Sequence, residues 1–417
     1  MTGSVKNSKS LTVLFLWLFL IYFPTYILGR SNSVGQILFF ITYLLTALSV
    51  LLIINRSLKI SFPAEEGISI LLVFILIILS FIVKIPFSSI QELINHSRFL
   101  FYLLVFLTIL NILHKSKVSP PQLKKGISVT ILSLFAFNLM HVLVPDFISI
   151  INKRPIWDFR GISLGGPFVW SYIFSFFLIP FFYFYLHLLL SKFNFKNLFS
   201  VTFILICMLL GQSKACYIAL AFTLVNYTLV SMYYKLDNRR KIYFGALCFC
   251  LVVITLLSVF PLLFSGVING FTSLFSNEVD ASTSGRLRQI NLTLLSLTDG
   301  NISEFIFGVK VPSEIIENAY FSYFYKYGIV GVSGLILFYL YLTFVSYKYL
   351  NDAINRRYDL VSLSVILGFN AMVVSIYIFS LGASPIDANK SSYFFFFIWA
   401  VVLYIRKYNE KKLLICY

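Results

Sequence analysis

Long apolar runs recur along this chain and constrain its fold more than any other feature. A membrane-spanning helix needs about 20 predominantly apolar residues, and the 417-residue sequence contains twelve runs near this length. The runs cover residues 11–28, 34–54, 67–85, 98–113, 126–144, 167–190, 198–212, 215–234, 242–264, 328–347, 360–381 and 391–405. Runs 98–113, 198–212 and 391–405 are short and also fit tilted, extended or partly re-entrant helices.

Composition agrees with this pattern. Hydrophobic residues make up 59% of the chain and charged residues 12%, whereas soluble domains contain roughly 25% charged residues. The sequence therefore predicts an all-α, polytopic integral membrane protein with about 12 transmembrane helices, organised as a single membrane domain over residues 1–417. Lys6 and Lys9 precede the first run and no small-residue cleavage site follows it, which predicts an uncleaved first span.

The distribution of charge predicts the orientation. Cytoplasmic connections of membrane proteins carry an excess of Lys and Arg. With the N-terminus inside, the inner segments hold 21 of the 33 basic residues and six of the 16 acidic ones, a net charge of +15 inside against +2 outside. Both termini are therefore predicted to be cytoplasmic. The overall charge of +17 is a topology signal, so we predict no nucleic acid partner.

Two connections on the predicted outer side are rich in polar residues: 145–166 and 265–327. A loop as long as the second is usually functional or disordered. It has alternating apolar positions, two neighbouring arginines, several carboxylates and few Pro or Gly residues, which favours order. We therefore expect a large, partly helical periplasmic loop that forms the lid of an active site, and a smaller periplasmic loop at 145–166.

Several common catalytic signatures are absent from the sequence. It contains no GxxxxGK[ST] phosphate loop, HExxH or DxD motif, and no Cys/His spacing typical of a metal site. The five cysteines lie in apolar runs or the C-terminal tail and predict no disulfide framework. We therefore predict neither a metal nor another cofactor.

The predicted outer side offers cations instead: Arg160, Lys214, Arg286 and Arg288, with the carboxylate of Glu317 further along the loop. Arginine binds phosphate bidentately and stays charged, so arginines beside a lipid surface favour a phosphate-bearing lipid substrate. Each residue also has a structural interpretation. The arginines of the long loop fit an interfacial helix, Lys214 fits a snorkelling position, Arg160 fits a pair with Asp158, and Glu317 fits a helix N-terminus.

Arg286 and Arg288 lie on an expected helix that begins near residues 282–284. Its apolar stripe consists of Leu287, Ile290, Leu294 and Leu297, which recur at helical spacing. At about 100° per residue, Arg286 lies at the edge of this stripe, and Arg288 points about 160° away from its centre. We therefore expect Arg286, rather than Arg288, to point into a pocket beneath the helix.

The order of motifs over residues 150–345 resembles the O-antigen polymerase and ligase superfamily (Wzy type). The motifs that carry this resemblance are Arg160-Gly161, Ser213-Lys214, Ser284-Gly285-Arg286, Phe307-Gly308 and Glu317-Asn318-Ala319-Tyr320. Lys214 stands where arginine is common in the family, and Val309-Lys310 replaces a second glycine. Glu317 stands where the ligases have histidine, which favours a polymerase.

The resemblance implies a metal-independent glycosyltransferase in the bacterial inner membrane, with its active site on the periplasmic face. Its substrates would be undecaprenyl-diphosphate-linked oligosaccharides in the lipid bilayer, and the growing glycan would be transferred to a new lipid-linked repeat unit. Further partners would be a chain-length regulator and a flippase. The implied roles are diphosphate contacts for Arg160, Lys214, Arg286 and Arg288, general base or acceptor orientation for Glu317, and acceptor-side contacts for Asn318 and Tyr320.

Two alternative functions stay open. An O-antigen ligase would carry out the same chemistry with lipid A core as the acceptor. A flippase of lipid-linked repeat units, or another transporter, would also have about a dozen spans. Transport normally places ionisable residues inside the spans, at roughly 2.5–3.5 kcal/mol each. The span interiors of this chain are nearly free of them, so the sequence favours the enzyme.

Overall fold

A computed structural model describes a helical bundle in which most of the predicted spans of the C-terminal three quarters of the chain can be located. The described residues are 82, 102, 106–107, 109–110, 113–114, 117–145, 157–158, 161–162, 164–168, 170–236, 239–259, 261, 268, 272, 281–298, 300–309, 316–386 and 389–416. The predicted spans 11–28, 34–54, 67–85 and 98–113 lie wholly or mostly outside them, as does Arg160.

In the described part of the chain the elements follow one another as helices, with one short strand pairing. The helices are α5 (Pro120–Leu143), α7 (Ser171–Ser191), α8 (Phe195–Leu210), α9 (Lys214–Tyr233), α10 (Arg239–Val259), α12 (Ala281–Thr298), α13 (Ile302–Phe307), α14 (Ala319–Asn355), α15 (Leu360–Gly382) and α16 (Asn389–Cys416). Strands β1 (Trp157–Asp158) and β2 (Gly161–Ile162) pair antiparallel, with Trp157 opposite Ile162.

Five of the described helices, α5, α7, α9, α14 and α15, are long and apolar enough to cross a membrane. The prediction of a helical, multi-pass membrane protein is therefore confirmed for this part of the chain, and the total of about 12 spans stays a prediction. Helix α14 consists of two helices joined at Gly328, whose backbone is not helical. The second begins where the span 328–347 was predicted, and the first, residues 319–327, is helical within the predicted loop 265–327.

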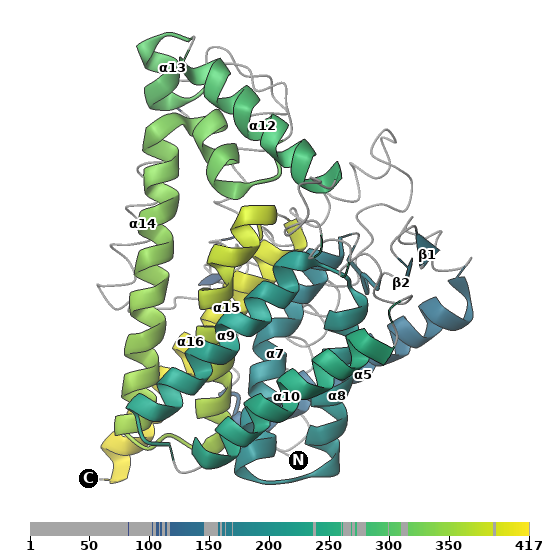
Figure 1. The fold of residues 1–417 in the computed structure, drawn as a ribbon. Coiled ribbons are helices and arrows are strands. Elements are labelled where there is room, and N and C mark those ends of the chain that lie inside the picture. Colours follow the sequence, from purple (N-terminus) through teal and green to yellow (C-terminus); the bar gives the residue numbers. More distant parts are fainter. Residues whose placement is uncertain are drawn as a thin grey trace.

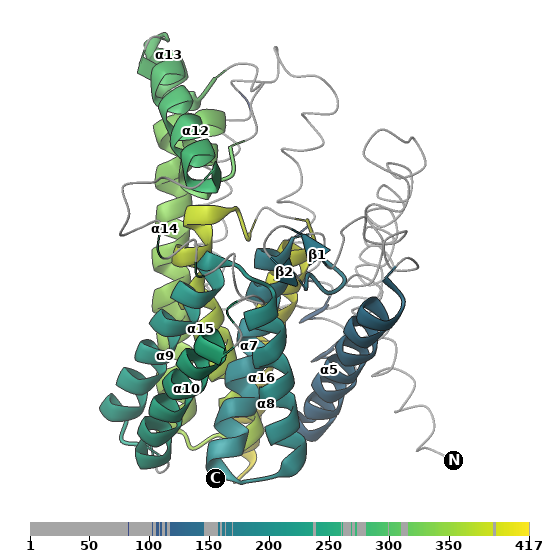
Figure 2. The same cartoon turned by 45° about the vertical axis from the view of Figure 1, so that its right-hand side comes forward.

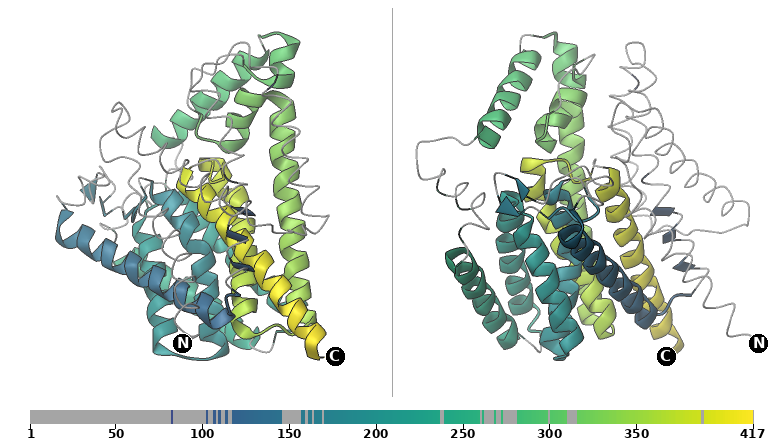
Figure 3. Two further views of the ribbon diagram at one scale, coloured as in Figure 1. Left: turned by 180° about the vertical axis from the view of Figure 1, so that it is seen from behind. Right: turned by 90° about the vertical axis from the view of Figure 1, so that its right-hand side faces the viewer.

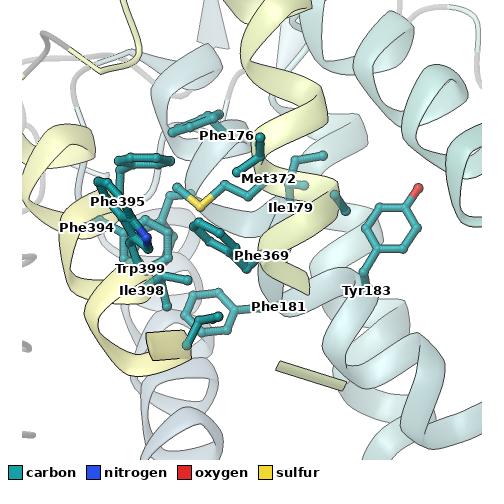
Figure 4. Close-up of a cluster of buried hydrophobic side chains, with 14 of the residues drawn as sticks. Phe176, Ile179, Phe181, Tyr183, Phe369, Met372, Phe394, Phe395, Ile398 and Trp399 are labelled. Carbon is teal, nitrogen blue, oxygen red and sulfur yellow. The ribbon is translucent and has the colours of Figure 1, made fainter. Parts of the chain in front are cut away.

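Helix α7 lies at the centre of the bundle and packs most extensively against α15, with α8, α9 and α16 around it (Figure 1). Aromatic side chains and Met372 fill the contact between α7, α15 and α16; the rings include Phe176, Phe369, Phe395 and Trp399, and all five side chains are fully buried (Figure 4). The hydroxyl of Tyr183 points away from this cluster and donates to Thr223 of α9 at 2.9 Å. The centre of the bundle is thus held by ring packing, with hydroxyls directed to its rim.

Basic residues lie in the connections at one end of the bundle. The turns α7–α8, α9–α10 and α14–α15 carry Lys192, Lys235 and Arg356 and lie at one end. At this end Arg406 of α16 pairs with Asp352 of α14 at 3.0 Å and with Glu410 at 3.3 Å. We call the opposite end, where α15 finishes and α9 begins, the Gly382 end. Helices α12 and α13 lie beyond it, at the tip of α14 (Figure 2; Figure 3 gives two further views).

Uncharged polar side chains join three of the helices inside the apolar region. The Nδ2 group of Asn226 on α9 donates to Oδ1 of Asn370 on α15 at 2.8 Å, and Asn370 donates to Ser346 on α14 at 3.1 Å. Tyr347 donates its hydroxyl proton to Asn226. Hydrogen bonds between such groups stabilise helix association in a membrane, because a polar group without a partner in hydrocarbon raises the free energy. These contacts therefore fix α9, α14 and α15 relative to one another.

Gly368 allows α15 to approach α7 very closely. A Cβ atom at Gly368 would lie 2.3 Å from the carbonyl oxygen of Pro180, which is a backbone atom and cannot move away cheaply. Pro180 lies inside α7, where its ring removes a helical hydrogen bond. The absence of a side chain at Gly368 is thus what seats the two central helices against each other.

We expect Gly368→Ala to lower the free energy of unfolding by about 1–3 kcal/mol, the usual cost of overpacking a core. Thermal unfolding of the purified protein in detergent would measure this loss. Gly245→Ala on α10 is the matched control, because a Cβ there meets only Leu190 Cδ2 at an ordinary 3.4 Å. Equal melting temperatures for the two variants would contradict the prediction.

Candidate active site

Asn318 fixes the point where α14 begins. Its Oδ1 atom accepts hydrogen bonds from the backbone N–H groups of Tyr320 at 3.0 Å and Phe321 at 3.2 Å, which is a helix N-cap. Its Nδ2 group donates to the carbonyl oxygen of Leu381 at 3.0 Å. The buried side chain thus ties the start of α14 to the last turn of α15. This contact fixes the start of the short helix 319–327, which lies before Gly328 and the apolar run 328–347.

Helix α12 contacts the rest of the protein through a face different from the one its leucines predict. Arg286 and Gln289 are half-buried and Thr293 and Leu297 are buried. Leu287 and Leu294, both in the predicted stripe, are 48% and 41% exposed. Ile290 and Leu297 of the predicted stripe lie on the contact face and Leu287 and Leu294 do not, so the prediction is only partly right. The polar side chains of the contact face bind Glu317, just before α14, and the backbone of α12 itself.

The expected direction of the two arginines does agree with the structure. Arg286 faces α14 and Arg288 is exposed. The Nε atom of Arg286 lies 3.4 Å from Oε2 of Glu317, in an ion pair whose side chains are 33% and 52% exposed. Glu317 directly precedes the N-cap of α14. Two of the residues singled out for chemistry, 31 positions apart in sequence, are therefore in contact.

Gln289 makes a second contact with the same residue. Its Oε1 atom accepts a hydrogen bond from the backbone N–H of Glu317 at 3.0 Å. Gln289 and Arg286 are three residues apart and so lie on one face of α12. One helix face therefore holds both the main chain and the carboxylate of Glu317. Gln289 was not predicted from the sequence, although its spacing from Arg286 could have suggested it.

The guanidinium of Arg286 also reaches the Gly382 end of the bundle. A Cβ atom built at Gly382 would lie 3.9 Å from Nη2 of Arg286 and 3.8 Å from Cβ of Ala215. Ala215 follows Lys214, the first residue of α9, and the side chain of Ser213 makes no capping bond to that helix. The positive end of the α9 dipole therefore lies close to the guanidinium. Arg286, Lys214 and Glu317 come from three segments that meet here.

The smaller loop reaches the same end of the bundle. The N–H group of Leu164 donates to the carbonyl oxygen of Leu210, the last residue of α8, at 3.0 Å. Gly166 has a φ of +54°, and a Cβ there would collide with the ring of Phe174 at 2.6 Å. Residues 164–168 are thus seated beside the turn that carries Ser213. Arg160 lies outside the described residues, so its place near Arg286 stays a prediction.

Phe307-Gly308, one of the motifs of the resemblance, has a packing function in this fold. Gly308 has a φ of +86°, and a Cβ there would lie 2.4 Å from the carbonyl carbon of Lys326. The N–H group of Val309 donates to the carbonyl oxygen of Tyr325 at 2.9 Å. This contact attaches α13 to the N-terminal part of α14. The motif therefore holds α13 in place, and it contributes no reactive side chain.

Tyr320 is the second residue of α14 and lies three residues after Glu317. Its ring packs edge-on against Tyr339, with 6.1 Å between ring centroids. The hydroxyl group of Tyr339 is 2.9 Å from that of Ser380 on α15. Tyr320 is thus seated over the contact of α14 and α15. Among the described residues, no group of three or more His, Cys, Asp or Glu side chains is arranged to hold a metal ion.

Comparison of the sequence with models of known protein families finds no match, and comparison with curated proteins finds no similar sequence. The resemblance noted above is therefore carried by the motifs and their order alone. The geometry adds one fact that the motifs do not contain: a cation and a carboxylate meet at the Gly382 end of a membrane-type bundle.

Proposed function

We propose that the protein is an O-antigen polymerase. In this proposal it transfers a growing undecaprenyl-diphosphate-linked glycan onto a new lipid-linked repeat unit at the periplasmic face of the bacterial inner membrane. The observation that carries the proposal is the contact of Arg286 with Glu317, beside the start of α9 and the end of α15. The charge bias of the connections supports an outer position for this end of the bundle.

The donor side of the proposed reaction uses the cations. The bond between the anomeric carbon of the glycan and its diphosphate breaks, and the diphosphate leaves with the electron pair. Arg286, Lys214 and the positive end of α9 stabilise the charge that develops on the leaving group. Arg160 and the exposed Arg288 are further diphosphate contacts in the proposal. Arginine suits this task because its planar guanidinium binds phosphate oxygens in pairs.

The acceptor side uses the first residues of α14. A hydroxyl group of the incoming repeat unit attacks the anomeric carbon, and its proton passes to the carboxylate of Glu317, which acts as general base. Asn318 fixes the helix start from which Glu317 projects, and Tyr320 lies one turn further on. The new glycosidic bond replaces the one to diphosphate, so no net oxidation or reduction occurs.

The charge and polarity of the described helices favour an enzyme over a transporter. Arg286 and Glu317 lie at the Gly382 end, whereas Asn226, Asn370 and Ser346 are hydrogen-bonded to one another. A transporter normally places ionisable groups near the membrane midplane. The ligase differs from the polymerase in its acceptor alone, so an experiment has to separate these two.

The deciding experiment is a lipopolysaccharide ladder from a strain that lacks the gene, with and without complementation. For a polymerase, we expect the ladder to collapse to core carrying a single repeat unit and to return when the gene is restored. A ligase would leave long glycan on the undecaprenyl carrier and bare core. An unaltered ladder would contradict the proposal, as would loss of all repeat units from the core.

A further inference from the structure

The contact between Arg286 and Glu317 sets the two proposed functional groups against each other. The carboxylate that would take a proton from the acceptor lies 3.4 Å from the guanidinium that would bind the donor. A carboxylate oxygen directed at a guanidinium is poorly placed to accept a proton from a sugar hydroxyl. The arrangement in this structure therefore corresponds to a resting state of the site.

The pair can be separated at low cost. Its side chains are 33% and 52% exposed, and exposed ion pairs contribute roughly 0–1 kcal/mol because solvent screens them. A diphosphate brings several charged oxygens and can bind a guanidinium through two parallel hydrogen bonds, which are stronger than a single lateral contact. A diphosphate that reaches Arg286 is thus expected to displace the carboxylate.

The main chain around Glu317 is held independently of the pair. Gln289 accepts the backbone N–H of Glu317 at 3.0 Å, and Asn318 is bonded both to the first turn of α14 and to Leu381. Separation therefore requires only a rotation of the Glu317 side chain. The carboxylate stays on the same fixed backbone and can turn from the arginine to an acceptor.

We propose that the Arg286–Glu317 pair is a latch that the donor diphosphate opens, so that the general base is released only after the donor has bound. This inference rests on the proposed function, because it assigns the order in which that site takes its two substrates. The chemistry recognised by the latch is a diphosphate, either free or attached to a polyprenyl lipid.

The test is a binding measurement on the full chain in lipid nanodiscs, with inorganic pyrophosphate and with a polyprenyl diphosphate as separate probes. Glu317→Gln removes the competing charge and is expected to tighten diphosphate binding about two- to fivefold, the range that an exposed ion pair allows. Arg286→Ala is expected to weaken binding about tenfold or more. The probe that binds more tightly tells whether the lipid tail contributes.

A double variant separates the latch from a general effect of charge. In the Arg286→Ala background, Glu317→Gln should give no gain, because there is no pair left to break. Glu304→Gln on α13 removes another acidic charge of the lid and should leave the affinity unchanged. A gain that persists without Arg286, or no gain from Glu317→Gln alone, would overturn the latch. Unchanged binding by Arg286→Ala would instead remove the diphosphate site on which the proposed function depends.

Discussion

Alanine in place of Arg286 is expected to reduce the rate of glycan chain extension by about a hundredfold or more, the usual cost of removing one preorganised group that stabilises a leaving charge. Arg286 is the residue that links the three parts of the candidate site: it contacts Glu317 and lies over the junction of α15 and α9. Among the described groups, its loss would leave the departing diphosphate with Lys214, the end of α9 and the exposed Arg288.

The measurement is the length and yield of the lipopolysaccharide ladder in a deletion strain that carries each variant at equal protein level. Arg286→Lys keeps the charge but not the planar fork, so we expect partial activity. Arg288→Ala, on the exposed side of the same helix, should cost far less. A normal ladder from Arg286→Ala would exclude this residue from the chemistry. Equal losses from Arg286→Ala and Arg288→Ala would show that only the charge of α12 matters.

The helices of the bundle could be predicted from the sequence because burial in lipid leaves a strong local signal. Runs 167–190, 215–234 and 360–381 correspond closely to α7, α9 and α15. The run 328–347 gives the start of the long part of α14, but the short helix 319–327 before it could not be predicted in this way. That helix begins at Asn318, whose amide reaches Leu381, a residue 63 positions away, and it ends at the non-helical Gly328. The hydropathy of the sequence predicts neither the Asn318 contact nor the kink at Gly328.

Arg286 and Glu317 could be singled out from the sequence, but the geometry of the candidate site could not be predicted. Arg286 and Glu317 stood out as charges on the predicted outer side, and their contact depends on the rotation of α12 about its axis. The hydrophobic pattern did not predict the packed face of α12 correctly, because Leu287 and Leu294 are exposed while Gln289 faces Glu317. The hydrogen bond from the backbone N–H of Glu317 to Gln289 and the packing of Arg286 over Gly382 join residues that are far apart in the sequence. Only the folded chain shows them.

Gly328→Ala is expected to detach α13 from α14 and so to disorganise the lid. Gly328 has a φ of 64° and a ψ of −162°, a combination that residues with a side chain rarely adopt. A Cβ atom there would lie 2.3 Å from the carbonyl oxygen of Ile306 and 2.6 Å from the nitrogen of Gly308. Both are backbone atoms. We expect backbone strain of about 1–3 kcal/mol in addition to about 1–3 kcal/mol from overpacking.

Hydrogen exchange of residues 302–309 in the purified protein would measure this effect, because local opening of α13 exposes its amides. A local loss of about 2 kcal/mol corresponds to roughly thirtyfold faster exchange. Gly285→Ala on α12 is the control, since a Cβ there meets nothing within 4 Å and alanine favours a helix. Unchanged exchange at α13 would contradict the prediction. Faster exchange in α7 and α15 as well would mean that Gly328 supports the whole bundle, because the strain would then have spread beyond the contact with Ile306 and Gly308.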